Sequence, residues 1–154
     1  MNGGSHCQKG KSYSSGHSHR AHEGHKENMN ENEVSEKIIG CAIKVHSALG
    51  PGLLESVYER VLAYELKACG FQIDTQKPIS FSYENIVFEE GFRADILVED
   101  CVIVEIKSVK KIEDIHFKQL LSYLKLSKLK LGLLINFNEV LLKDGIKRVI
   151  NGKI

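Results

Sequence analysis

The sequence has no long apolar run, no cysteine motif and almost no net charge. A membrane-spanning helix needs about 18 consecutive apolar residues, and no stretch reaches this length. The polar N-terminus also lacks the apolar core of a secretory signal peptide. The four cysteines are scattered, with no CxxC pair and no zinc-ribbon spacing. These absences predict a cytoplasmic protein with reduced thiols and no membrane contact. The net charge of +1 gives no overall field that favours or excludes a polyanionic partner.

The composition divides the chain into a tail and a domain. Residues 1–33 are rich in His, Gly, Ser and Asn and have almost nothing to bury, which predicts a disordered polar tail. Four histidines lie close together in it, at positions 17, 19, 22 and 25. They fit a weak transition-metal site or an ordinary solvated tail. Residues 34–154 are enough for one domain with a substantial core.

Periodicity predicts the order of elements in this domain. Apolar residues recur at helical spacing over 35–49, where Ser35 is the expected N-cap, and again over 53–69. Dense β-branched and aromatic residues predict strands at 78–83, 86–98 and 101–107. A helix over 113–126, a buried strand over 131–136 and a last strand near 145–150 follow. We expect an α/β fold, that is, an α+β mixed sheet with flanking helices.

Charged residues interrupt the most strand-like segment, "RADILVEDCVIVEIKS". Glu105 and Lys107 share one face of their strand, because side chains alternate along a strand. Asp95 lies on the preceding strand, with Ala94, Ile96 and Val98 expected on its opposite face.

The turn between these strands decides whether Asp95 meets Glu105. A three-residue connection over 99–101 pairs Val98 with Val102 and places Asp95 across from Glu105, with Arg93 across from Lys107. A two-residue connection places Asp95 opposite Val104, on the wrong face. A shared site therefore requires an odd loop or a bulge.

Two adjacent carboxylates repel each other unless a cation lies between them. Oxygen ligands suit Mg²⁺ or Mn²⁺, and a nearby lysine can stabilise the charge that develops on a phosphate under attack. The same short pattern is also common as a surface ion pair.

Two helices add polar residues to this pattern. Glu55 lies in the first turn of its helix, where compensation of the helix dipole alone could explain it. Gln119 and Tyr123 lie one turn apart on the helix that follows the strand of Lys107. The same spacing is also typical of a surface Gln beside a core Tyr.

Together, these residues resemble the PD-(D/E)XK nuclease superfamily. More closely, "GLLESVY", with Gly52, Glu55 and Tyr58, resembles its GxxExxY branch. The resemblance covers about residues 34–150. It implies a restriction-endonuclease-like α-β-β-β-α-β core, here with an extra N-terminal helix and a C-terminal strand.

The resemblance also implies roles for the site residues. Asp95 and Glu105, joined by Glu55, would bind Mg²⁺, with Mn²⁺ as an alternative. Lys107 would be the catalytic lysine, and Gln119 would position the substrate or the lysine. Tyr123 would lie beside the site. One departure is Ala94, where many members have proline.

Lysines cluster from the end of the strand that carries Glu105 and Lys107 onward. Residues 107–130 contain seven lysines against two acidic residues, an excess of five positive charges. Lys110 and Lys111, with Arg93 on the other strand, are therefore candidates for phosphate contacts. A solvated helix face is the alternative.

The sequence thus predicts a Mg²⁺-dependent nuclease that acts on DNA, with RNA as an alternative substrate. A non-catalytic nucleic-acid-binding or adaptor module with the same fold is the second hypothesis. A small structural or toxin–antitoxin-type interaction protein is the third. The oligomeric state stays open, with a homodimer as one alternative.

Overall fold

A computed structural model describes residues 29–154 of the chain. Most of the predicted tail, including Cys7 and the four clustered histidines, lies outside the described residues. The described residues form three α-helices, five strands and one short 3₁₀ helix. In chain order these are α2 (Glu31–Leu49), α3 (Glu55–Ala68), β1 (Ile73–Tyr83), β2 (Ile86–Val98), β3 (Val102–Lys107), α4 (Asp114–Ser127), β4 (Leu131–Asn136), η1 (Leu142–Gly145) and β5 (Ile146–Ile150).

The five strands form one mixed sheet in the order β1-β2-β3-β4-β5. Neighbouring strands are antiparallel except β3 and β4, which are parallel. A parallel pair needs a crossover, and α4 provides it. The predicted fold class is confirmed: an α-β-β-β-α-β core carries the additional helix α2 and the additional strand β5.

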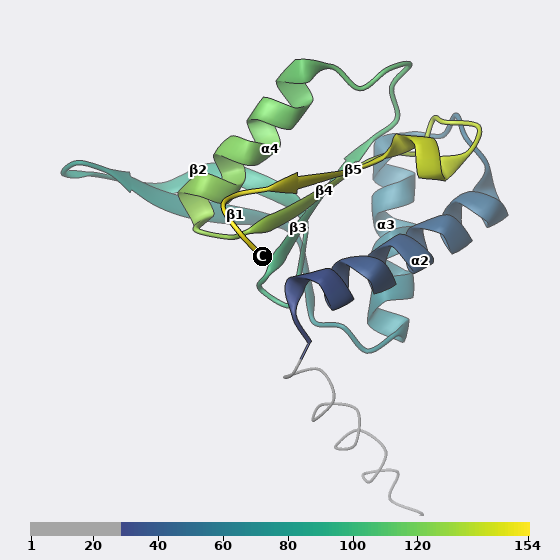
Figure 1. The fold of residues 1–154 in the computed structure, drawn as a ribbon, viewed down its shortest axis with the longest axis horizontal. Helices are drawn as coiled ribbons and strands as arrows, with labels where there is room; N and C mark the ends of the chain where they lie inside the picture. Colours follow the sequence, from purple (N-terminus) through teal and green to yellow (C-terminus); the bar gives the residue numbers. More distant parts are fainter. Residues whose placement is uncertain (1–28) are drawn as a thin grey trace, which may run out of the picture.

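Helices cover both faces of the sheet, with α2 and α3 on one side and α4 on the other (Figure 1). Val102, Val104 and Ile106 of β3 pack in the larger core with α2 and α3. Ile103 packs on the opposite face with Leu120 and Leu124 of α4. Strand β3 is therefore buried on both faces, and a charged side chain can remain in it only where the covering layer ends.

Two boundaries differ from the prediction by more than two residues. Helix α2 begins at Glu31 and is capped by Asn30 in a capping box with Glu33, rather than by Ser35, which is buried. Strand β1 begins at Ile73 instead of residue 78, because Ile73 packs against the larger core. The polar residues that follow it belong to an edge strand, where little burial is required.

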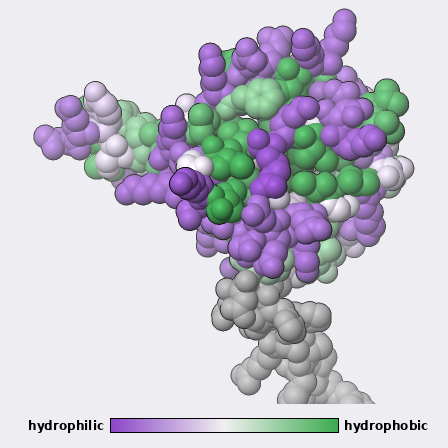
Figure 2. Space-filling view, viewed as in Figure 1, coloured by the Kyte–Doolittle hydropathy of each residue, from purple (hydrophilic) through white to green (hydrophobic). Residues whose placement is uncertain are grey.

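The distal part of the β1–β2 hairpin projects away from the helices (Figure 1). Its exposed apolar side chains include Tyr83, Ile86 and Val87. In the space-filling view, hydrophobic and hydrophilic side chains both cover the projecting part of the hairpin (Figure 2). Within residues 29–154, no helix combines the length and the apolar character needed to cross a membrane.

Candidate metal and phosphodiester site

Asp95 and Glu105 lie side by side where β2 and β3 stop pairing. Of the two connections considered, the three-residue one is present, and Val98 lies opposite Val102. Glu99 and Asp100 adopt positive φ angles of 52° and 53°, and the Cys101 N–H closes the turn on the Val98 carbonyl at 3.0 Å. The ladder runs from this turn to Ile96–Val104, so the next residues on the two strands are Asp95 and Glu105.

Backbone hydrogen bonds hold both carboxylates at this point. The Asp95 N–H donates to Glu105 Oε1 at 3.3 Å, and the Ile106 N–H donates to Asp95 Oδ2 at 2.9 Å. Beyond Asp95 the two strands separate, so Arg93 does not lie across from Lys107 as expected. The Arg93 guanidinium instead forms an exposed ion pair with Glu90.

Glu105 is the most perturbed acid in the described part of the chain. Its side chain is buried, with only 6% of the residue exposed. Burial, followed by the charge of Asp95, raises the pKa of Glu105 to about 8, while the Lys107 ammonium acts in the opposite direction. Within residues 29–154, neither Asp95 nor Glu105 has an ion-pair partner within 4.0 Å. A cation at this position would therefore stabilise the ionised pair.

The side chains of β2 change the face of the sheet to which they point at Asp95. Ile96 and Val98 pack in the larger core as expected, but Ala94 packs with Phe92 in the α4 cluster. The register with β1 is the same on both sides, with Thr75 opposite Ile96 and Lys77 opposite Ala94. The residue of β1 between these pairs, Gln76, has a φ of 52°. The irregular backbone thus lies where the alternation of side chains is broken. Ala94, which was expected on the same face as Ile96 and Val98, lies on the α4 face instead.

The segment from Gly50 to Tyr58 is a closed turn that positions the start of α3. Gly52 has a φ of 92°, which glycine adopts without steric cost. The Tyr58 hydroxyl donates to the Gly50 carbonyl at 2.6 Å and accepts from the Leu53 N–H at 3.0 Å. Its ring stacks on Phe137 at a centroid distance of 4.5 Å. Within the segment "GLLESVY", Gly52 and Tyr58 therefore hold the shape of the turn.

The turn brings Glu55 to the end of β3. Glu55 Oε1 accepts from the Ser108 N–H at 3.3 Å, and the Ser108 hydroxyl donates to the Leu53 carbonyl at 2.6 Å. Glu55 is exposed and makes no described hydrogen bond to Asp95 or Glu105. It thus borders the strand end that carries Lys107.

Gln76 contacts Asp95 and links it to Glu59, and neither Gln76 nor Glu59 was among the predicted site residues. Gln76 Nε2 lies 3.1 and 3.0 Å from the two oxygens of Glu59 and 3.2 Å from Asp95 Oδ1. Burial raises the pKa of Glu59, and the charges of Asp95 and Glu55 add to this rise. The spacing of Glu59, one helical turn after Glu55, was a usable signal; nothing in the sequence marked Gln76.

Helix α4 contributes Tyr123 to the site and leaves Gln119 exposed. The Tyr123 ring stacks on Phe92 at 4.0 Å. Burial raises the pKa of Tyr123, and the charges of Glu105 and Asp95 raise it further, so its hydroxyl lies in their field. Gln119 makes no described hydrogen bond and is free to contact another molecule.

Asn136 organises the loop that follows Lys107. It lies opposite Lys107 at the end of β4 and is fully buried. Its Oδ1 accepts from the N–H groups of Val109 and Asn138 at 3.1 and 3.2 Å, and its Nδ2 donates to the Val109 carbonyl at 2.9 Å. The loop that leads to the exposed Lys110 and Lys111 is therefore fixed at its base.

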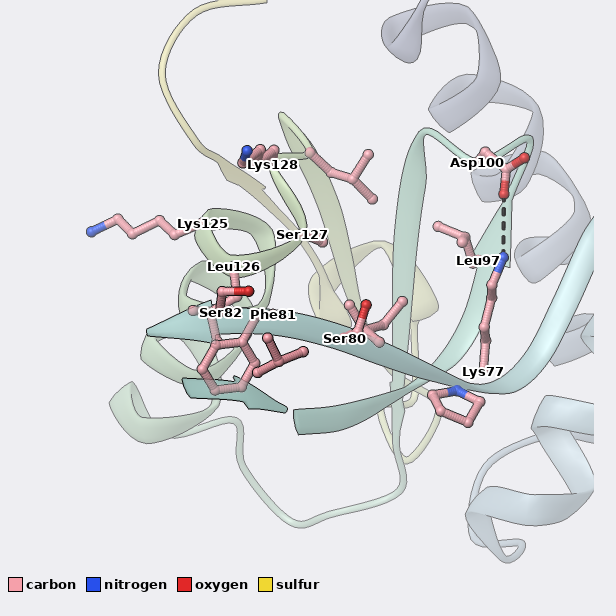
Figure 3. Close-up of a pocket in the computed structure, with 14 residues that line it drawn as sticks. Lys77, Ser80, Phe81, Ser82, Leu97, Asp100, Lys125, Leu126, Ser127 and Lys128 are labelled. Atoms are coloured by element: carbon pink, nitrogen blue, oxygen red, sulfur yellow. Dashed lines mark ion pairs between the residues drawn. The ribbon is translucent and has the colours of Figure 1, made fainter. Parts of the chain in front are cut away.

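Four of the lysines after β3 lie in two separate regions. Lys110 and Lys111 lie on the loop near the site, whereas Lys125 and Lys128 line a groove of about 690 Å³ between β1 and the end of α4. Figure 3 shows Lys77 reaching Asp100 in this groove, with 3.6 Å between Nζ and Oδ1, while Lys125 extends outward. Asp95, Glu105 and Lys107 do not line this groove, so it is separate from the acidic site.

The donors at the acidic site are all carboxylate oxygens, the ligand type that Mg²⁺ and Mn²⁺ prefer. In the described part of the chain, no three acidic, His or Cys side chains lie close enough to form a complete metal site. The donor chemistry fits a hard divalent cation that keeps several waters.

Comparison with known proteins gives one match. The family model described as the PD-(D/E)XK nuclease superfamily matches residues 32–149, most of the chain and all of the candidate site. The chain matches none of the curated proteins and none of the solved structures compared with it.

Proposed function

The chain belongs to the PD-(D/E)XK nuclease superfamily, and on this premise we propose that it is a metal-dependent nuclease that hydrolyses phosphodiester bonds of DNA. RNA is the alternative substrate. The observation that carries the proposal is that Asp95 and Glu105 lie side by side where the β2–β3 ladder ends. Lys107 follows two residues after Glu105 on β3. Within the superfamily, the closed turn from Gly50 to Tyr58 supports placement in the GxxExxY branch.

The proposed roles follow from the positions of the side chains. Asp95 and Glu105 would bind Mg²⁺ or Mn²⁺, and Glu55 would join them from the start of α3. When bound, the ion would supply positive charge at the scissile phosphate and a lower pKa for an attacking water. The Lys107 ammonium, on the same face of β3 as Glu105, would stabilise negative charge that develops on the phosphate.

The remaining proposed residues would contact the substrate. Gln119 is exposed on α4 and would position the substrate or Lys107. Tyr123 borders the carboxylates, while Lys110, Lys111 and Arg93 are exposed around the opening. Phosphate contacts by such cations give binding that is independent of sequence and weakens with salt.

One observation favours a second function, a nucleic-acid-binding or adaptor module without catalysis. Within residues 29–154, the acidic groups do not form a complete metal site. Such a module would bind nucleic acid in low salt without metal-dependent turnover. The third hypothesis, an interaction protein of another class, predicts no salt-dependent retention of nucleic acid.

The deciding experiment incubates the pure protein with plasmid DNA, single-stranded DNA and RNA in Mg²⁺, in Mn²⁺ and in EDTA. Asp95→Ala and Lys107→Ala are tested in parallel, with Asp74→Ala and Lys37→Ala as matched exposed controls. Cleavage that requires metal, survives in both controls and disappears in both site variants supports the nuclease. Binding without cleavage by any protein supports the adaptor module.

Two further proposals concern the state of the protein. A homodimer would place one acidic site on each strand of a duplex; we propose this state on duplex DNA, and light scattering with and without an oligonucleotide tests it. A cytoplasmic location fits the free thiols of Cys41, Cys69 and Cys101, and cell fractionation tests it.

A further inference from the structure

Gln76 has an unusual backbone for its position in β1. Its φ of 52° lies in the left-handed region, which residues with a side chain rarely adopt within a strand. The pairs on either side, Thr75–Ile96 and Lys77–Ala94, keep the same register, so no extra residue explains the irregularity. Left-handed backbone at a non-glycine residue persists where the surrounding contacts hold it, and such positions concentrate at functional sites.

The side chain of Gln76 connects three elements. From β1, its Nε2 lies 3.1 and 3.0 Å from the Glu59 oxygens on α3, and 3.2 Å from Asp95 Oδ1 on β2. Both carboxylates can only accept hydrogen bonds, so the NH₂ end of the carboxamide must face them. With two N–H groups, one amide can donate to each carboxylate.

This contact keeps two like charges together without a cation. In the described part of the chain, neither Glu59 nor Asp95 forms an ion pair. The other Asp95 oxygen accepts from the Ile106 N–H, so the orientation of Asp95 is fixed from β3 and from β1 at the same time. Glu59 is thereby the residue of α3 that is connected to Asp95, while Glu55 is bonded to Ser108.

We propose that Gln76 is a positioning residue of the cation site, whose carboxamide, held by Glu59, orients Asp95 for binding the divalent cation. This inference rests on the proposed function, which requires a cation at Asp95 and Glu105. It adds two residues that orient a ligand, and the sequence singled out neither of them.

The test measures Mn²⁺ affinity by calorimetry in the wild type, Glu59→Gln, Gln76→Ala and Gln76→Gly. Gln72→Ala is the matched control, because the Gln72 side chain is exposed and makes no described hydrogen bond. Removing an orienting partner of a metal ligand typically weakens metal binding by about 10- to 100-fold. We expect a loss in this range for Glu59→Gln and both Gln76 variants, and none for Gln72→Ala.

Gln76→Gly separates the side chain from the backbone. Glycine accepts the left-handed conformation freely, so this variant should keep the fold even if Gln76→Ala does not. Mn²⁺ binding by Gln76→Gly that is equal to or tighter than that of the wild type would overturn the inference, because the carboxamide would then have no positioning role.

The double variant Gln76→Ala/Glu59→Gln shows whether Glu59 acts through Gln76. If it does, the double variant binds Mn²⁺ about as weakly as Gln76→Ala alone. Fully multiplicative losses would instead indicate two independent effects and contradict the proposed connection.

The two proposals fail in different ways. If the wild type neither binds Mn²⁺ nor cleaves nucleic acid, the proposed function fails and the inference fails with it. If the wild type binds Mn²⁺ and cleaves, but Glu59→Gln and Gln76→Gly behave like the wild type, only the inference is overturned.

Discussion

Each of the two central carboxylates is held by the strand that carries the other. The Asp95 N–H donates to Glu105 Oε1, and the N–H that follows Glu105, that of Ile106, donates to Asp95 Oδ2. Asp95 and Glu105 therefore form one unit across two strands, although their charges repel. This reciprocal arrangement leads to the first prediction.

Glu105→Gln should make the metal-free protein more stable at high pH and little different at low pH. The fold raises the pKa of Glu105 from its ordinary value of 4.5 to about 8, because burial and Asp95 disfavour its charged form. The stability contributed by the protonated form is complete below pH 4.5 and is lost as pH rises through about 8. Glutamine keeps an acceptor for the Asp95 N–H and carries no charge.

Denaturant unfolding in EDTA at pH 4 to 9 measures this effect. We expect Glu105→Gln to gain on the order of a few kcal/mol over the wild type at pH 9. The exposed Glu89→Gln serves as the control and should show no such trend. A gain for Glu105→Gln that is the same at every pH would contradict the explanation.

Tyr58→Phe should destabilise the fold by about 1–3 kcal/mol, because it leaves the Gly50 carbonyl and the Leu53 N–H without their partner. The stacking on Phe137 is retained. Thermal unfolding measures the loss. Tyr64→Phe is the matched control on the same helix, since Tyr64 is 70% exposed and makes no described hydrogen bond. Equal stability of the two variants would show that the motif tyrosine matters only through its ring.

Asn136→Leu should cost about 2–4 kcal/mol, because the change keeps the number and branching of the side-chain heavy atoms but removes three hydrogen bonds in a buried position. Asn138→Leu removes one side-chain bond, at 3.2 Å, and should cost less. Hydrogen exchange at the Val109 N–H gives a local measure. We expect faster exchange in Asn136→Leu, and unchanged exchange would refute the view that Asn136 fixes this loop.

Lys110→Ala combined with Lys111→Ala should weaken nucleic-acid binding in low salt for all sequences alike. Each lost phosphate contact on duplex DNA should make the slope of log affinity against log salt shallower by about 0.9. Fluorescence anisotropy over a salt series measures both quantities. Lys37→Ala on α2 is the control, because Lys37 is exposed and far along the chain from the site. An unchanged slope would place the phosphate contacts elsewhere.

The sequence predicted the parts of the site that depend on side-chain alternation, but it left the length of the turn between β2 and β3 open. Asp95 and Glu105 meet because the connection has three residues, and the period of two then determines the facing of Glu105 and Lys107. These are local rules, and β2 and β3 are neighbours in the chain. The expected positions of β4 and α4 also agree with the structure, because long apolar patterns mark them.

The missing residues depend on contacts that no local pattern encodes. Gln76 lies in the polar half of β1, which the sequence did not identify as a strand, and its left-handed backbone has no glycine to mark it. Arg93 was misplaced because the β2–β3 ladder ends before it, where the two strands separate. Asn136 reaches the loop after Lys107 only through the parallel pairing of β3 with β4.

That parallel pairing has a consequence for the order of folding. The β1–β2 hairpin joins neighbouring segments and can form early, whereas β3 reaches β4 only after α4 has crossed the sheet. The strand with Glu105 and Lys107 therefore has its second neighbour only when the long-range contacts are complete. A nascent chain could bring Asp95 and Glu105 together early, because β2 and β3 are consecutive, but the loop after Lys107 would gain its support from Asn136 only among the last events of folding.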